Sequence, residues 1–232
     1  MADKGKLVGV SVGPGDPDLM TIAAVKAIEA ADVIAVPNIG HKRQTALGIA
    51  AEYVGNKELL DCSTPMVHSM EERQAAHDDN ARKICEMLDA GRNVAYLCLG
   101  DIAIYASYAS IHERVLAAGY EAEIIPGVTS FSATAARLGK VLCEGNERLL
   151  IAPVVGGDVD EALDVKANKV FMKNRHEVLE LRDKLEARGE LEYASMVANC
   201  GLPDEKVFHH LSDITEEDAD YFSVIIVKKP RG

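Results

Sequence analysis

Short apolar runs rich in β-branched residues recur through the first half of the chain, and helical patterns separate them. The runs are LVGVSV (7–12), DVIAVP (32–37), NVAYLCL (93–99) and AEIIP (122–126). Parallel strands need long crossover connections, which are usually helices that pack on the sheet. The alternation therefore predicts an α/β fold whose first part is a parallel sheet with helices on its faces.

One of the separating helices is marked at both ends. In HSMEERQAAHDDNARKICEMLDAGR, Ser69 and Glu72 have the spacing of a capping box, in which each side chain satisfies a backbone N–H at the start of a helix. Ile84 and Leu88 recur at helical spacing, and Gly91 is a typical helix stop. The pattern predicts an amphipathic helix between Ser69 and Gly91.

The pattern changes after Pro126. A helix of small residues comes first, and most of the later segments read as strands, with one long helix, RHEVLELRDKLEARG (175–189), among them. We expect a second α/β domain with a mixed sheet, so that domains 1–126 and 127–232 make up the chain. The helix is VTSFSATAARLG (128–139), and the strand-like runs are LLIAPV (149–154), KVFM (169–172), ASMVAN (194–199) and FSVIIVKK (222–229).

Charge and composition exclude several classes of protein. The formal net charge is −12, which disfavours general binding to nucleic acids or anionic membranes because both need a basic face. No apolar run reaches the roughly 18 to 20 residues of a membrane span, and the N-terminus lacks a long apolar signal region. We expect a cytoplasmic protein. Its 5 cysteines form no CxxC pair, so we expect reduced thiols and no structural zinc.

The segment GVSVGPGDPDLMT (9–21) places two glycines between a strand and a helix, as dinucleotide-binding loops do. Here Asp18 takes the place of the third glycine, and Asp16 with Pro17 suits a helix start whose N–H groups are already capped. Carboxylates at that positive end repel phosphate. Asp32 opens its strand instead of closing it, and no GK[ST] follows. The turn therefore suits a ligand other than a polyphosphate, or no ligand at all.

A second glycine turn repeats this design. In LCLGDIAIYASY (97–108) a strand ends at Gly100, and Asp101 and Tyr105 follow before a helix. Ligands of open α/β sheets bind beyond the carboxyl ends of strands, where both turns are expected. Two turns that carry acids favour a cationic or zwitterionic ligand, such as a sulfonium with an amino-acid group.

Several segments together resemble the tetrapyrrole (corrin/porphyrin) methyltransferases over nearly the whole chain. They are GVSVGPGDPDLMTIAAVKAIEAADVI, LCLGDIAIYASY, EIIPGVTSFSATAARLG, VFMK and VANCGLPDEKV. The resemblance implies two α/β domains and an active site in the cleft between them. It also implies S-adenosylmethionine as methyl donor, a tetrapyrrole as substrate, and a homodimer.

The resemblance also assigns residues to the cofactor. One departure is Ile102, which stands where the family usually has the proline of a GDP turn; without that proline's fixed φ the loop is expected to be more mobile or differently bent. The implied cofactor contacts are Pro14, Leu99, Gly100, Asp101, Ile104, Tyr105, Thr129, Ser130, Met172, Ala198, Asn199 and Phe222.

Two residues are candidates for a catalytic role. Methyl transfer from a sulfonium to an electron-rich carbon is an in-line displacement, so the protein mainly aligns the reactants. Asp101 is the candidate catalytic or orienting carboxylate, and its alternative is a side chain that stabilises a turn or caps a helix. Lys173 is the candidate for binding a substrate carboxylate or moving a proton, and its alternative is a solvated surface lysine.

A tetrapyrrole with many carboxylates needs local positive charge on an acidic protein. A solvated surface position is the alternative for each candidate taken alone. We predict no metal site, because His209 with His210 and the His77-Asp78-Asp79 run lack further ligands; any cobalt would arrive with the substrate. The candidate substrate contacts are Lys42, Arg43, Arg137, Lys140 and Arg175.

Three rival functions remain open at this point. A sister enzyme could methylate another position of a corrin ring or of uroporphyrinogen. A non-catalytic module could sense a nucleotide. A diphthamide-forming methyltransferase of the same fold would act on a protein.

Overall fold

The computed structural model describes residues 4–37, 45–63, 69–174, 177–219 and 222–229. The chain divides into two compact units, Met1–Thr129 and Ser130–Gly232, and each unit is described by itself. The division falls in the connection between strand β5 (Ala122–Ile125) and helix α6 (Ser130–Arg137), the same connection that contains Pro126.

The first unit holds a five-stranded sheet in the order β3-β2-β4-β1-β5, and every neighbouring pair is parallel. Strands β1 and β2 are buried at every position, as strands covered on both faces must be. The parallel sheet predicted from the alternating runs is confirmed. Edge strand β3 was not expected, because its ELLD segment is mostly exposed and lacks an apolar pattern. The remaining strands are β1 (Leu7–Ser11), β2 (Val33–Val36), β3 (Glu58–Asp61) and β4 (Val94–Cys98).

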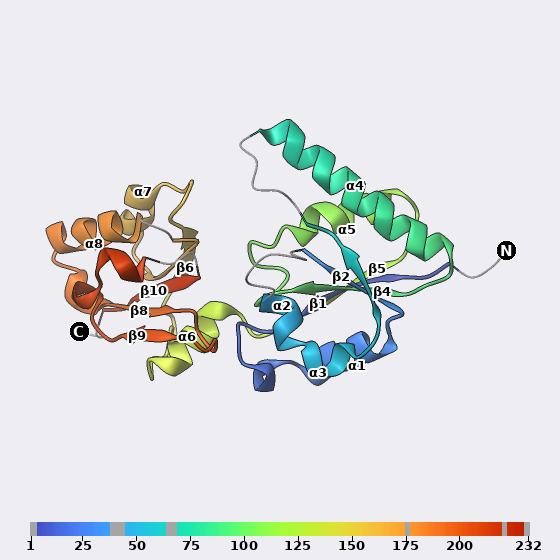
Figure 1. Cartoon of the computed structure of the whole chain (residues 1–232). Helices are drawn as coiled ribbons and strands as arrows, with labels where there is room; N and C mark the ends of the chain where they lie inside the picture. The colour runs from blue at the N-terminus through green and yellow to red at the C-terminus, as the bar shows by residue number, and fades with distance from the viewer. Residues whose placement is uncertain (1–3, 38–44, 64–68, 175–176, 220–221, 230–232) are drawn as a thin grey trace. The chain divides into compact units, whose positions relative to one another are not determined.

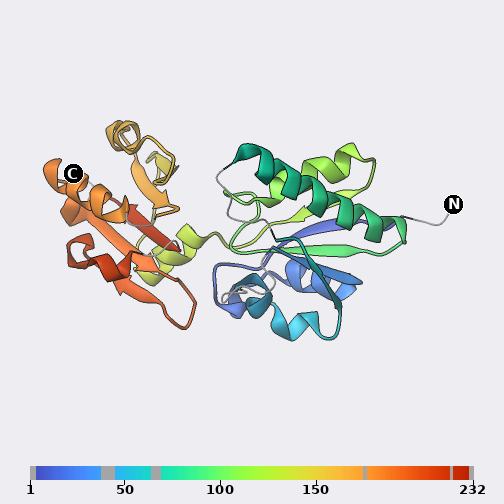
Figure 2. The same ribbon diagram turned by 45° about the horizontal axis from the view of Figure 1, so that its top comes forward.

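Helices cover both faces of this sheet. Figures 1 and 2 show α1, α2 and α3 on one face and α4 and α5 on the other, and two separate apolar clusters lie under these layers. The Ser69 bond of the predicted capping box of α4 is present, since Ser69 Oγ accepts a hydrogen bond from the N–H of Glu72 at 3.1 Å. The helices are α1 (Ile22–Ala30), α2 (Thr45–Ile49), α3 (Ala51–Val54), α4 (Met70–Asp89) and α5 (Tyr108–Ala117).

The start of α1 differs from the expectation. Asp16 caps only a short 3-10 helix, η1 (Pro17–Leu19), where Asp16 Oδ1 accepts from the N–H of Asp18 at 3.0 Å. Met20 is then extended, and Thr21 Oγ1 caps α1 itself. The N-terminus of α1 is therefore capped by a neutral hydroxyl, and the two carboxylates lie one turn earlier.

The second unit holds a mixed sheet, as predicted, in the order β6-β7-β10-β8-β9. Strands β6 and β7 are parallel, whereas β10 runs antiparallel to β7 and β8, and β9 antiparallel to β8. The strands are β6 (Leu149–Pro153), β7 (Asn168–Met172), β8 (Ala194–Ala198), β9 (Lys206–Phe208) and β10 (Ser223–Val227).

Helices α7 (Val159–Asp164) and α8 (Glu177–Ala187) pack on this sheet around the buried side chains of Phe171, Met196 and Ile225. Helix α6 contacts β8 and β10. The described residues of this unit also form three short 3-10 helices, η2 (Leu191–Tyr193), η3 (Leu211–Asp213) and η4 (Glu216–Asp218). No helix within the described parts of the chain is long and apolar enough to cross a membrane.

Candidate active site

The strand order of the first unit creates a reversal point between β1 and β4. From β1 the chain crosses over β4 to reach β2, and from β4 it crosses over β1 in the opposite direction to reach β5. Open α/β sheets bind ligands beyond the carboxyl ends of the strands at such a reversal. Both glycine turns found in the sequence follow these two strands.

The two glycine turns are hydrogen-bonded to each other. The N–H of Gly100 donates to the carbonyl of Gly13 at 2.7 Å, and the N–H of Gly13 donates to the carbonyl of Gly100 at 3.2 Å. Both residues are left-handed, with φ of 76° at Gly13 and 72° at Gly100, a conformation that side chains disfavour. A Cβ at Gly13 would also lie 3.2 Å from the carbonyl oxygen of Leu19. The turns therefore form one paired unit of backbone.

Asp101 ties this pair to the end of β5. Its Oδ2 accepts from the N–H of Gly127 at 2.7 Å and its Oδ1 from the N–H of Ala103 at 2.9 Å. A Cβ at Gly127 would lie 2.5 Å from Ser11 Cβ and 3.0 Å from the carbonyl oxygen of Gly100. The three connections that follow β1, β4 and β5 therefore meet here without side chains between them. Each oxygen of the Asp101 carboxylate thus accepts from a backbone N–H, and a chemical role for it stays a prediction.

Ile102, the departure from the family pattern, has two clear functions in the loop. Its N–H donates to the buried Oγ of Ser11 at 2.9 Å, a bond that a proline could not make because it has no N–H. Its side chain is 3% exposed and, with Tyr108, fills the space above Gly9. The Ser11 bond and this packing therefore hold the loop where a proline would restrict φ.

The other predicted residues of the first unit differ in exposure. Pro14 is buried, and Leu99, Ile104 and Thr129 are half-buried. Tyr105 is 41% exposed and lies in the loop that leads from β4 to α5.

In the second unit, five predicted cofactor or catalytic residues gather at one edge of the sheet. Strands β6, β7 and β8 run in the same direction and β10 runs in the opposite one, so β10 begins where the other three end. The N–H of Asn199 donates to the carbonyl of Phe222 at 3.1 Å. The five residues at this edge are Met172, Lys173, Ala198, Asn199 and Phe222; Ser130 begins α6 of the same unit.

Backbone conformation singles out three of the predicted residues. Within the described residues, the non-glycine residues with positive φ are Tyr105, Lys173 and Asn199, each at 54°. Such a conformation costs about 1 kcal/mol or more and persists only where the surroundings impose it, often at functional sites. Each of the three follows the carboxyl end of a strand. The candidate residues of the first unit and those of the second unit lie at such strand ends.

The candidate substrate contacts have different surroundings. Arg137 forms an ion pair with Glu205 at 2.5 Å, and the same carboxylate accepts from the N–H of Gly201, just after β8, at 2.7 Å. Lys140 instead lies 2.5 Å from Ser195 Oγ near the start of β8, and burial lowers its pKa. The structure therefore brings Arg137, but not Lys140, to the loop that follows Asn199. Lys42, Arg43 and Arg175 lie outside the described residues.

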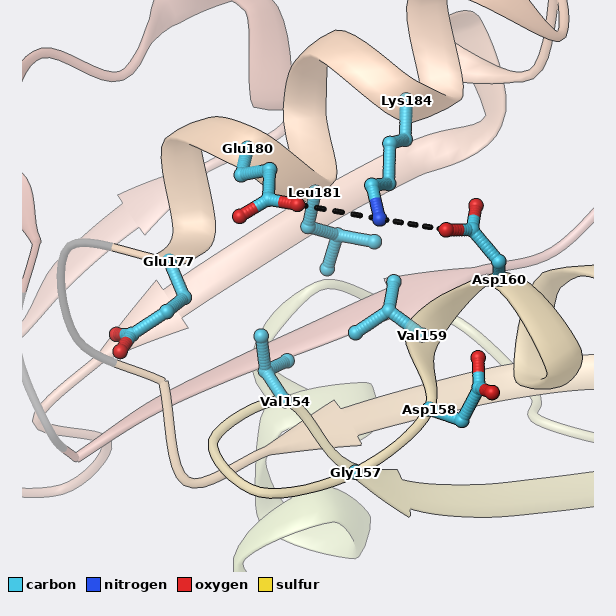
Figure 3. A pocket seen from close by; sticks show the side chains of 9 residues that line it. All are labelled: Val154, Gly157, Asp158, Val159, Asp160, Glu177, Glu180, Leu181 and Lys184. Carbon is cyan, nitrogen blue, oxygen red and sulfur yellow. Dashed lines mark hydrogen bonds and ion pairs between the residues drawn. The ribbon is translucent and has the colours of Figure 1, made fainter.

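A cavity of about 370 Å³ opens in the second unit between the β6–α7 connection and α8 (Figure 3). Lys184 at its wall forms ion pairs with Asp160 at 2.7 Å and Glu180 at 3.1 Å. Four carboxylates and one ammonium suit a substrate rich in carboxylates poorly. None of the candidate residues lines it; its walls are Val154, Gly157, Asp158, Val159, Asp160, Glu177, Glu180, Leu181 and Lys184. Among the described residues no group of three His, Cys, Asp or Glu side chains could hold a metal ion.

Two contributors to these edges were missed in the sequence analysis. Ser11 lies inside the first quoted motif, but nothing there indicates that its hydroxyl accepts from Ile102. Asn174 follows the VFMK segment and donates to the carbonyl of Ser223 at 2.7 Å. No local sequence pattern predicts either hydrogen bond, because the two residues that each bond joins lie far apart in the sequence.

Glycine turns at the reversal point of a parallel sheet, followed by a second unit with a mixed sheet, agree with the class that the sequence resembles. The family model described as Tetrapyrrole (Corrin/Porphyrin) Methylases matches residues 6–215, and the chain belongs to this family.

Two relatives and one solved structure show the similarity to individual proteins. The chain is 31% identical to a cobalt-precorrin-2 C(20)-methyltransferase of Salmonella typhimurium, over 97% of this chain and 97% of that protein. It is 30% identical to a precorrin-2 C(20)-methyltransferase of Sinorhizobium sp, over 96% of this chain and 95% of that protein. The solved structure of a cobalt precorrin-4 methyltransferase has the same fold, with a TM-score of 0.76 at 21% identity, covering 96% of this chain and 94% of that one.

Proposed function

We propose that this chain transfers the methyl group of S-adenosylmethionine to C20 of precorrin-2 or of cobalt-factor II, the cobalt complex of sirohydrochlorin, in cobalamin biosynthesis. The observation that carries the proposal is the full-length similarity to two relatives that are both named C(20)-methyltransferases. The segments DVIAVPNIG, GDIAIYASY and YFSVIIV also resemble that branch of the family. Identities of 31% and 30% do not favour one substrate over the other.

The described residues fit a zwitterionic methyl donor. The paired turns at Gly13 and Gly100 offer backbone without side chains, which permits close approach of a ligand. We propose that the residues assigned to the cofactor by resemblance, in both units, contact this donor.

The donor supplies an electrophilic methyl group, and the tetrapyrrole carbon is the nucleophile. The contribution of the chain is to hold the donor in line with that carbon, which can lower a barrier by several kcal/mol. Asp101 orders the turn on which Gly100 and Tyr105 lie, through its bonds to the N–H groups of Gly127 and Ala103. Lys173 is proposed to bind a substrate carboxylate or move a proton, and Arg137 to bind a further carboxylate.

Lys42, Arg43 and Arg175 complete the proposed substrate contacts, which rest on charge alone; Lys140 lies near the start of β8, away from the loop that follows Asn199. We also propose that the protein works in the cytoplasm as a homodimer, and the family resemblance supports this proposal.

Two measurements test the proposed function. Calorimetry should give micromolar binding of S-adenosylhomocysteine and no binding of NAD or ATP; the reverse pattern would identify a nucleotide-sensing module. Incubation with methyl-labelled S-adenosylmethionine and either precorrin-2 or cobalt-sirohydrochlorin should then place the label at C20, located by mass spectrometry and NMR. A label at another ring position would identify a sister methyltransferase, and methylation of a protein would identify the diphthamide alternative.

Asp101→Asn separates the two roles of that carboxylate. An amide presents one acceptor oxygen instead of two, so a purely structural Asp101 predicts weaker S-adenosylhomocysteine binding together with a lower melting temperature. A chemical role predicts a turnover number that falls at least tenfold while binding stays within twofold. An unchanged turnover number would exclude the chemical role.

A further inference from the structure

The start of β10 is hydrogen-bonded to residues just beyond the ends of its two neighbouring strands, β7 and β8. The carbonyl of Phe222 accepts from the N–H of Asn199, which follows β8, at 3.1 Å. The next carbonyl, that of Ser223, accepts from the side-chain amide of Asn174, which lies just beyond β7, at 2.7 Å. Two consecutive carbonyls therefore join the ends of three strands.

The backbone is strained just beyond the ends of both β7 and β8. Lys173 and Asn199 have φ of 54°, and a lysine has no short polar side chain that could stabilise this conformation locally. Asn174 directly follows Lys173, so a fixed Asn174 restrains the peptide unit that joins them. The Lys173–Asn174 peptide is held on both sides: the carbonyl of Lys173 accepts from the N–H of Val155 at 3.3 Å, and the amide of Asn174 is fixed to the carbonyl of Ser223 at 2.7 Å.

Asn174 is held at a cost in stability. It is 0% exposed, and its Oδ1 has no hydrogen-bond partner among the described residues. An unpaired buried carbonyl is unfavourable, and leucine at position 174 would remove it, but leucine would also leave the carbonyl of Ser223 without its amide donor, so the two effects on stability oppose each other. Ser223, which is 1% exposed, has an unpaired Oγ in the same place. A residue that serves only packing would be replaced at little cost.

We propose that Asn174 is a positioning residue that keeps Lys173 left-handed and so holds the second-unit edge, from Met172 to Lys173, in the geometry that the methyl donor requires. This inference rests on the proposed function. Asn174 itself does not touch the donor. Its amide acts through the carbonyl of Ser223, and the backbone at Lys173 carries the effect to the edge of the sheet.

The test uses Asn174→Leu in the full chain, because leucine has a similar shape and cannot donate to Ser223. S-adenosylhomocysteine should bind roughly tenfold more weakly by calorimetry, while the melting temperature stays near that of the parent protein. A crystal structure of this variant should show Lys173 with negative φ. Asn174→Ala serves as the second variant if leucine prevents folding.

Asn168→Leu is the matched control. Asn168 lies at the opposite end of β7, and its amide also donates to a backbone carbonyl, that of Leu142, at 2.7 Å. Its substitution should leave the affinity for S-adenosylhomocysteine within twofold. An equal loss of affinity in both variants would reduce Asn174 to a general stabiliser of β7 and overturn the proposal.

A second pair of variants tests the conformation at Lys173. Lys173→Gly and Lys173→Val both remove the ammonium group, but glycine adopts positive φ freely and a β-branched residue does not. Binding should be at least fivefold tighter for the glycine variant. Equal binding by the two variants would refute a requirement for the left-handed conformation.

The failure of this inference is distinguishable from the failure of the proposed function. A parent protein that does not bind S-adenosylhomocysteine refutes the proposed function. A variant without the Asn174 amide whose crystal structure retains positive φ at Lys173 refutes the positioning role, whatever the ligand is.

Discussion

A single methyl group added at Gly127 should separate the three connections that meet at the edge of the first sheet. An alanine Cβ there would lie 2.5 Å from Ser11 Cβ, 3.0 Å from the carbonyl oxygen of Gly100 and 3.4 Å from that of Ser11. The first distance is far inside van der Waals contact, and each of the three atoms belongs to the backbone or is bonded directly to it. The peptide at Gly127 must therefore move.

The size of the effect follows from two contributions. Overpacking of a well-packed site costs about 1 to 3 kcal/mol. The same movement weakens the 2.7 Å bond between the N–H of Gly127 and Asp101, and hydrogen bonds to charged groups contribute about 1.5 to 3 kcal/mol. Because part of the strain relaxes as the bond lengthens, we expect Gly127→Ala to lower the free energy of unfolding by about 2 to 4 kcal/mol.

Urea denaturation measures this change, and Gly48→Ala is its matched control. Gly48 lies in helix α2, and a Cβ there would meet nothing within 4 Å, so alanine should be neutral or stabilise by up to about 1 kcal/mol. S-adenosylhomocysteine affinity should fall for Gly127→Ala and stay constant for Gly48→Ala. A Gly127→Ala protein as stable as the Gly48→Ala protein would refute the close approach of these connections.

Three further predictions concern other residues. Ser11→Ala removes the acceptor of the Ile102 N–H and should weaken S-adenosylhomocysteine binding about threefold to tenfold by calorimetry; unchanged affinity would contradict a role of this bond in holding the loop. Burial lowers the pKa of Lys169, which is 6% exposed, below its usual 10.5, so its stabilising contribution is present above pH 10.5 and is lost as the pH falls through the lowered pKa. At pH 7 the free energy of unfolding of Lys169→Met, measured with urea, should therefore exceed that of the parent by about 1 kcal/mol, and this difference in free energy should shrink toward pH 10.5. A less stable variant at pH 7 would show that the ammonium is favourably placed. Burial raises the pKa of Cys62 to about 12, so iodoacetamide at pH 8 should label it only after unfolding, and rapid native labelling would contradict its burial.

Local patterns were sufficient to predict the elements that are buried or capped. The runs that became β1, β2 and β4 are continuous and apolar because helices cover both faces of their sheet, and α4 begins at the Ser69 cap that its sequence indicates. Strands β3 and β9 were missed, because short edge strands are mostly exposed and carry little apolar signal. The cap of α1 was misplaced by one turn, since the extended Met20 that separates η1 from α1 has no sequence signature.

The chain alone therefore specifies which apolar segments form strands, where the glycine turns lie, and which family they resemble, because these properties depend on neighbours within a few residues. The partners of Asp101, Ser11 and Asn174 depend on folding: their bonds join residues 26, 91 and 49 positions apart. Hydrogen-bond geometry at the edge of a sheet is set by strand order and register. These bring distant backbone groups together, and no local pattern records them.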